Sequence, residues 1–89
     1  MVSVMEKEFI VSDWFNEAKV LKAKTVNEAA QELLGQPVVP TQDHSSSLVF
    51  GCELTEEVRD MVLSKEPGVD QSEALAVFPG VKHFIGVNA

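Results

Sequence analysis

The sequence predicts a small α+β domain, in which one sheet of about four strands carries two or three helices on one face. The chain has 89 residues, enough for one domain over residues 1–89 but not for two separate cores. Hydrophobic residues make up 45% of it, so the chain can bury a core. Segments with strand-like and helix-like spacing alternate, in the order strand, strand, helix, strand, helix, a segment that is either helix or strand, and a final strand.

A pair of strands is predicted near the N-terminus. The segment Val2–Val11 ends in three consecutive strand-forming residues at positions 9–11. Residues 15–23 then alternate in character, as in a strand with two different faces. We expect a hairpin that turns around Asp13-Trp14, with Phe15 in the core and Trp14 closing one end of it.

The strongest local signal is a capping box formed by Thr25 and Glu28. The Thr25 hydroxyl can accept a hydrogen bond from the amide of Glu28, and the Glu28 carboxylate can reach back to the amide of Thr25. Apolar residues follow at helical spacing until Gly35 and Pro37 end the helix. The sequence therefore predicts a helix over residues 25–34.

The middle of the chain predicts a loop, a strand and a second helix. Residues 36–47 contain two prolines and three serines, and we expect them to form a long surface loop. The apolar run at residues 48–52 is typical of a buried central strand. Thr55 is suited to cap the helix that follows, because Glu56 and Glu57 then lie in its first turn, where negative charge is favoured.

The last part of the chain allows two interpretations. Residues 74–78 and 81–87 can pair as a hairpin across Pro79-Gly80, but that dipeptide favours a type II turn, which twists the wrong way for a tight hairpin. The alternative is a helix over residues 71–78, because residues 70–73 have the form of a second capping box and the next residues favour helix. We favour the helix; residues 81–87 form a strand in either case.

The chain is strongly acidic. Fourteen acidic residues against seven basic ones give a formal charge of −7. The densest acidic stretch, here called the acidic set, has four members: Glu53, Glu56, Glu57 and Asp60. A solvated helix face or a helix N-terminus has the same character, but positions 56 and 60 share one face of a helix and can meet a basic partner together. Trp14 is a second candidate contact, since tryptophan is enriched at interface hot spots.

Several function classes are disfavoured. An anionic surface repels nucleic acid and anionic membranes, and the basic residues form no cluster beyond positions 19, 22 and 24. Two histidines and one cysteine, all distant in sequence, match no metal-ligand spacing. The glycines are scattered and form no phosphate-binding loop. We therefore expect no metal, no cofactor and no direct contact with nucleic acid or membrane.

Two sets of residues contain residue types that are found in active sites, but their positions do not support catalysis. Cys52 and His83 are a conceivable nucleophile and base, but a cysteine after an apolar run behaves as a small hydrophobe. Asp43, His44 and the serines at 45–47 contain the residue types of a hydrolase triad. Adjacent positions on one loop cannot supply the geometry that a triad needs.

These observations predict a small, non-catalytic, acidic binding protein that modulates a basic partner, for example a nucleic-acid-binding protein, as inhibitors, antitoxins and phage-encoded antagonists do. The alternative is a structural or assembly subunit, including a homo-oligomer, that pairs through a sheet edge at Phe9–Val11 or Val81–Val87. A small enzyme using Cys52 and His83 is a third. Charged residues at positions 6–8 interrupt any apolar signal segment. We therefore expect a cytoplasmic protein, located in the host cytoplasm if it is phage-encoded.

Overall fold

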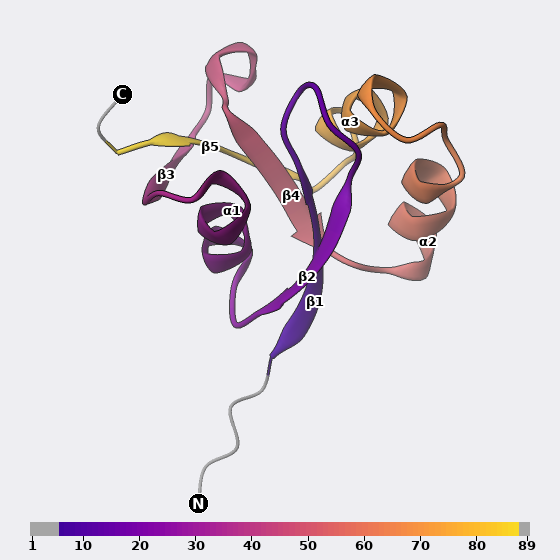
Figure 1. The fold of residues 1–89 in the computed structure, drawn as a ribbon, viewed down its shortest axis with the longest axis horizontal. Coiled ribbons are helices and arrows are strands. Elements are labelled where there is room, and N and C mark those ends of the chain that lie inside the picture. The colour runs from indigo at the N-terminus through magenta and orange to yellow at the C-terminus, as the bar shows by residue number, and fades with distance from the viewer. Residues whose placement is uncertain (1–5, 88–89) are drawn as a thin grey trace, which may run out of the picture.

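The computed structural model describes residues 6–87, so the start of the predicted segment Val2–Val11 lies outside the described residues. Five strands form one sheet: β1 (Lys7–Ser12), β2 (Lys19–Ala23), β3 (Val38–Thr41), β4 (Val49–Glu53) and β5 (Lys82–Gly86). Their spatial order is β2-β1-β4-β5-β3, and all neighbouring strands are antiparallel. The α+β prediction is confirmed, with one strand more than the expected four (Figure 1).

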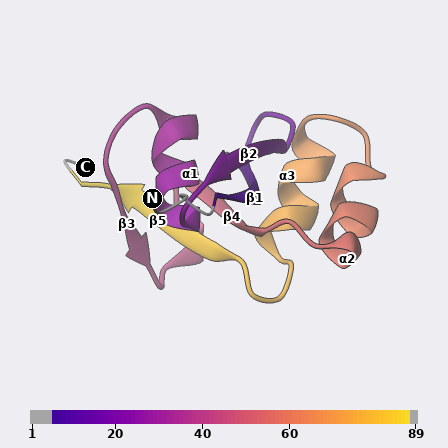
Figure 2. The same ribbon diagram turned by 90° about the horizontal axis from the view of Figure 1, so that it is seen from below.

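Three helices and two shorter turns complete the fold. The helices are α1 (Val26–Leu34), α2 (Glu56–Val58) and α3 (Val69–Ala76). A single 3₁₀ turn, η1 (His44–Ser46), precedes β4, and a π-helical turn, η2 (Arg59–Leu63), continues directly from α2. Figure 2 shows α2 and α3 grouped at one end of the molecule, while α1 and β3 lie toward the other.

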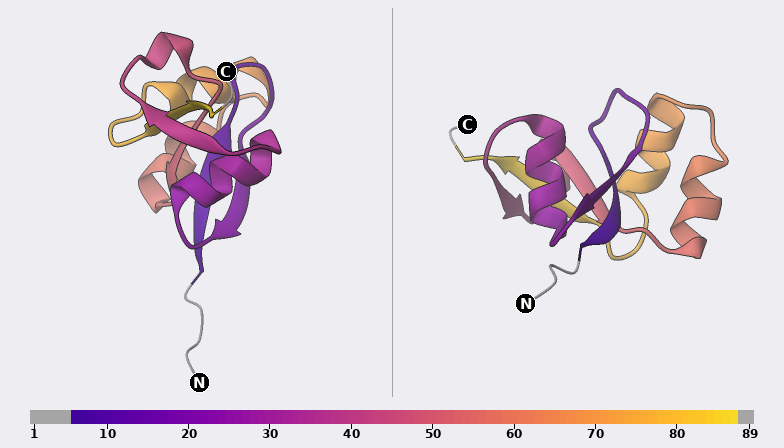
Figure 3. Two further views of the ribbon diagram at one scale, coloured as in Figure 1. Left: turned by 90° about the vertical axis from the view of Figure 1, so that its left-hand side faces the viewer. Right: turned by 60° about the horizontal axis from the view of Figure 1, so that its bottom comes forward.

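Helices cover both faces of the sheet, whereas one face was expected. Phe9 and Val11 belong to a core cluster with α1. Ile10 and Phe50 belong to a different cluster, which includes residues of α2, η2 and α3. Because successive side chains of a strand point to opposite faces, the consecutive buried residues of β1 require a cover on each side. Figure 3 shows α1 on one side of β1 and β4, and α2 and α3 on the other.

The sheet edges are not the predicted ones. Phe9–Val11 lies in β1, which pairs with both β2 and β4. The segment Val81–Val87 contains β5, which pairs with both β3 and β4. Both proposed edges are therefore interior strands. The alternative of an assembly subunit required these two segments to be free for pairing with another chain, and they are not. The true edges are β2, which carries two lysines, and β3, which carries a proline; both residue types discourage pairing with another chain.

Residues 36–47 are more ordered than a long loop. They contain β3 and η1, and β3 pairs with β5 in the register Val38↔Gly86 to Thr41↔His83. Pro40 is compatible with this strand because β3 lies at the sheet edge, where a missing amide leaves no ladder hydrogen bond broken. The prediction of one continuous loop was wrong, since the strand depends on a distant partner.

The first helix is confirmed together with both of its ends. The Thr25 hydroxyl accepts a hydrogen bond from the amide of Glu28 at 3.1 Å, and Gly35 ends α1 in the left-handed conformation with φ 80°. One detail differs, because the Glu28 carboxylate accepts from the amide of Lys24 at 3.2 Å rather than from that of Thr25. Thr55 caps α2 in the predicted way, accepting from the amide of Val58 at 3.2 Å.

The helical interpretation of the C-terminal part is confirmed, but its predicted start is wrong. Helix α3 is capped by Gly68, which has φ 113°, and Asp70 lies inside the first turn. A side chain at position 68 would be strained at that φ. The second capping box does not form because α3 begins two residues earlier than predicted, so Asp70 is a helical residue of the first turn and not the N-cap.

The predicted hairpin turn at Asp13-Trp14 is replaced by a longer loop over residues 13–18. The Asp13 carboxylate accepts from the amides of Phe15 and Asn16 at 2.9 and 2.8 Å. This local turn directs Phe15 outward, and its side chain is 78% exposed; the expectation that Phe15 enters the core was wrong. Trp14 does pack against the core, as predicted.

Within residues 6–87, none of the helices has the length and apolar character that crossing a bilayer requires.

Candidate functional site

Two buried serines hold the loop over residues 13–18 against α3. Ser12, at the end of β1, and Ser72, in α3, have no solvent exposure, and their hydroxyl oxygens lie 2.6 Å apart. The Ser72 hydroxyl reaches the carbonyl oxygens of Asp13 and Asn16, the latter at 2.6 Å. The Ser12 hydroxyl reaches the same two carbonyls at 2.8 and 3.0 Å. These contacts fix the loop on the helix.

Gln71 extends this connection to a second segment. Its side chain is 5% exposed. The Gln71 Oε1 accepts from the amide of Ala18 at 3.0 Å, and its Nε2 donates to the carbonyl of Lys65 at 3.1 Å. One side chain of α3 thereby ties the loop that carries Trp14 to the turn that carries Lys65.

Trp14 has a defined orientation at the end of this loop. Its Nε1 donates to the carbonyl of Ser47 at 2.7 Å. Its ring lies against Phe50, with centroids 4.8 Å apart and planes at 58°. The indole is therefore held at one end by a hydrogen bond and on one side by the core, and its remaining surface is aromatic carbon.

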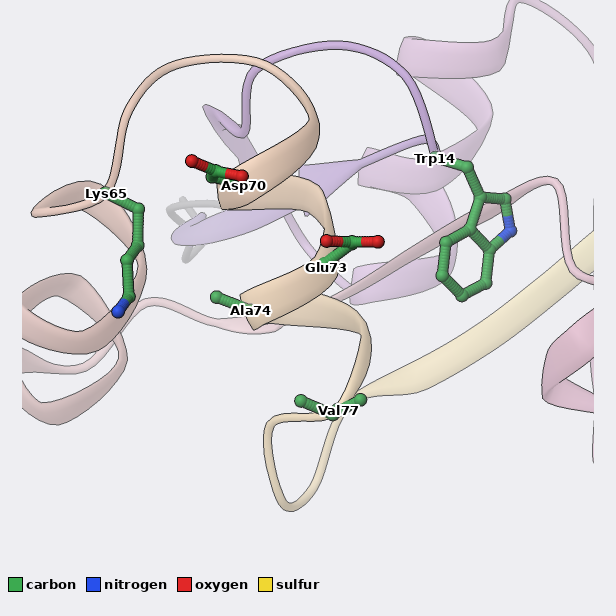
Figure 4. A pocket seen from close by; sticks show the side chains of 6 residues that line it. All are labelled: Trp14, Lys65, Asp70, Glu73, Ala74 and Val77. Carbon is green, nitrogen blue, oxygen red and sulfur yellow. The ribbon is translucent and has the colours of Figure 1, made fainter.

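The outer side of α3 forms a groove between the two segments that these connections hold in place, here called the α3 groove. It has a volume of about 590 Å³ and is lined by Trp14, Lys65, Asp70, Glu73, Ala74 and Val77. The four lining residues of α3 and its C-cap follow the spacing i, i+3, i+4, i+7, which places them on one helical face. Figure 4 shows this face between Trp14 on one side and Lys65 on the other.

The surroundings of the α3 groove are acidic. The segment 55–77, here called the helical end, contains six acidic and two basic residues, so it carries −4 of the total charge of −7. The ion pair found in the part of the chain that the structure describes lies elsewhere, between Lys7 and Glu53 at 3.2 Å. Lys65 forms no such pair with Asp70 or Glu73 within this part.

His83 occupies the core behind Trp14 and uses both ring nitrogens. Its Nε2 lies 3.0 Å from the carbonyl of Ala76 and its Nδ1 lies 2.8 Å from the Ser47 hydroxyl. Because a carbonyl can only accept, the neutral ring carries its proton on Nε2. Its Nδ1 is then an acceptor for the Ser47 hydroxyl, whose single proton also has the His44 carbonyl within reach at 2.9 Å. Burial lowers the pKa of His83 below its ordinary value, the bond to Ala76 opposes this shift, and the nearby His44 adds to it.

The Cys52–His83 pair lacks the features of an activated nucleophile. Burial raises the pKa of the Cys52 thiol, and the neighbouring Glu53 raises it further, whereas a reactive cysteine needs the opposite shift. Both nitrogens of His83 are engaged by Ser47 and Ala76.

The residues at positions 43–47 form a local turn. The Ser46 and Ser45 hydroxyls donate to the Asp43 carboxylate at 2.6 and 2.7 Å and lower its pKa. The ring of His44 stacks on that of His83, with centroids 3.9 Å apart. Across residues 6–87, no group of three or more histidine, cysteine or carboxylate side chains converges as a metal site would require.

Comparison of the chain with protein-family models, with curated proteins and with solved structures gave no match.

The structure separates the residues that the sequence singled out. Glu53 ends β4 and pairs with Lys7, while the other three members of the acidic set lie exposed on α2 and η2. Trp14 lines the α3 groove, where the acidic side chains are Asp70 and Glu73 rather than members of that set. Helical spacing alone could have placed 70, 73, 74 and 77 on one face. Only the tertiary fold brings Trp14 to that face.

Proposed function

We propose that the protein is a small, non-catalytic binding module whose helical end contacts a basic segment of a partner protein. It would act as a modulator in the manner of an inhibitor or antitoxin. The observation that carries this proposal is the concentration of charge, since residues 55–77 hold −4 of the −7 in one part of the fold. Such a surface attracts cationic segments and accelerates their association.

The helical end also exposes apolar side chains. The helical end exposes Met61, Leu63, Val69 and Val77 by 54%, 36%, 49% and 81%. Protein interfaces combine an apolar centre with a polar rim, and the helical end carries both kinds of group; five further exposed apolar side chains lie elsewhere within residues 6–87. The combination supports contact with a protein. A partner whose own task is to bind nucleic acid would offer a suitable basic surface.

The test compares two triple variants of equal charge. E56Q/E57Q/D60N neutralises three exposed carboxylates of the helical end, and E6Q/E8Q/E32Q neutralises three exposed carboxylates outside it. Proteins of the native host retained on the immobilised wild-type chain are identified by mass spectrometry, and their affinities for all three chains are then measured with purified protein. Three exposed ion contacts of roughly 0.5 kcal/mol each predict about tenfold weaker binding to the first variant.

The control variant should bind like the wild type. The retained partners should be basic, and added salt should weaken their binding. Partners that bind the wild type and E56Q/E57Q/D60N with equal affinity would contradict the proposal.

A further inference from the structure

We propose that the α3 groove receives an arginine side chain from the partner segment. This inference rests on the proposed function and identifies the group that the partner inserts. Asp70 and Glu73 are three residues apart on α3, so both side chains leave one helical face. In Figure 4 the Asp70 carboxylate is directed toward the Lys65 side of the groove and the Glu73 carboxylate toward Trp14. Both are exposed, and neither forms an ion pair with another residue of the region 6–87. A cation bound in the groove is attracted by both of these carboxylates.

The aromatic wall of the groove favours a cation that can also stack. The only polar atom of the Trp14 side chain is its Nε1, which is already bonded to the carbonyl of Ser47. Figure 4 shows this nitrogen directed away from Glu73, so that the carbon part of the indole is the part nearer the carboxylate. A cation over an indole ring gains a further attraction from the ring electrons. Trp14 is also fixed in advance, so binding need not order it.

The chemistry of the groove distinguishes arginine from lysine. A guanidinium is planar, stacks on aromatic rings and offers several N–H donors to carboxylates, whereas an ammonium is a compact and strongly hydrated charge. Ala74 and Val77 provide an apolar surface for the methylene groups of the arginine stem. In Figure 4 the Glu73 carboxylate points toward Trp14, and the Lys65 ammonium points away from Asp70. The Glu73 carboxylate and the indole therefore lie on the same side of the groove, away from the one lysine.

Trp14 supplies the signal for a direct test, because it is the single tryptophan and the chain has no tyrosine. Its fluorescence is recorded while the intact chain is titrated with blocked pentapeptides that carry arginine, lysine or neutral citrulline at the centre and glycine elsewhere. We expect a saturable change with the arginine peptide, binding several-fold weaker with lysine, and no saturable change with citrulline.

Two double variants locate the site. Loss of charge-assisted hydrogen bonds to Asp70 and Glu73 predicts about tenfold or greater weakening of arginine-peptide binding in D70N/E73Q. E8Q/E32Q changes the net charge equally and alters exposed carboxylates outside the groove, so it should bind like the wild type. Equal binding by both variants, equal binding of the citrulline peptide, or no saturable change with arginine would each overturn the inference.

The peptide titration and the partner-binding test can fail independently of each other. If E56Q/E57Q/D60N binds a partner more weakly than the wild type does while D70N/E73Q binds the arginine peptide with wild-type affinity, the helical end binds proteins, but the groove is not an arginine site. If the peptide results hold and no basic partner depends on the acidic residues of α2 and η2, the groove inference stands without the wider proposal.

Discussion

Replacing Ser72 by alanine should lower the free energy of unfolding, because it removes one of the two hydroxyl groups that hold the loop over residues 13–18. Ser12 and Ser72 are fully buried, and their two hydroxyl groups serve the carbonyl oxygens of Asp13 and Asn16. Each hydroxyl has one proton to donate. In Ser72→Ala, the single remaining proton of Ser12 cannot satisfy both carbonyls, so one of them loses its donor.

The magnitude follows from the loss of a part-buried hydrogen bond. That loss is about 1 kcal/mol, and for a domain of this size each 1 kcal/mol lowers the melting temperature by about 4–8 °C. The variant should therefore melt at least about 4 °C below the wild type. The loop that carries Trp14 loses part of its attachment to α3, so the native fluorescence of Trp14 should change as well.

Urea unfolding followed by Trp14 fluorescence measures the effect, with Ser46→Ala as the matched control. Ser46 is exposed and donates to the Asp43 carboxylate on the surface, so its replacement should alter the free energy of unfolding by no more than about 0.5 kcal/mol. A loss in Ser72→Ala as small as that of the control would refute the view that these serines clamp the loop to α3.

Three further results are expected from the same structure. Thr25→Ala removes the cap of α1 and should lower the free energy of unfolding by about 1 kcal/mol in urea titrations; an unchanged midpoint would contradict the cap. In Gly51→Ala the new β-carbon would lie 2.5 Å from the carbonyl oxygen of Ile10 and from Cγ1 of Val11, so the strands must separate, at a cost of about 1–3 kcal/mol or more; wild-type thermal stability would disprove this close approach. Burial holds the pKa of His83 below its ordinary value of about 6.5, so the unfolded chain takes up the proton first and stability should fall as the pH drops below about 6.5. NMR titration of the ring and urea midpoints between about pH 7.5 and 5.5 check this, and a His83 pKa at or above 6.5 would be incompatible with the buried ring.

The elements that the sequence predicted well are those that local interactions specify. Helix α1 has its cap at Thr25, its apolar face and its terminating Gly35 within eleven consecutive positions. The start of α2 at Thr55 is equally local. Each of these signals acts between residues at most four apart, so it operates before the rest of the chain has folded.

Two of the main errors concern contacts that only distant segments could provide, and a third, at Phe15, concerns a local turn. Residues 38–41 are a short run interrupted by Pro40, and they become β3 because β5 pairs with them. Phe15 has the character of a core residue, but the carboxylate of Asp13 shapes a turn that directs it outward. The burial of both faces of β1 depends on α1 and α3 arriving from opposite sides.

From its composition and local patterns alone, the chain specified an α+β domain, the position of its capped helices and a strong excess of negative charge. The tertiary structure alone decided which carboxylates would share a groove with Trp14. The Ser72 hydroxyl reaches the carbonyl of Asn16 across 56 positions, and Gln71 bonds to Ala18 across 53. Hydrogen bonds of this kind form only after the sheet has brought distant backbone segments together, and no spacing rule within a single segment can encode them.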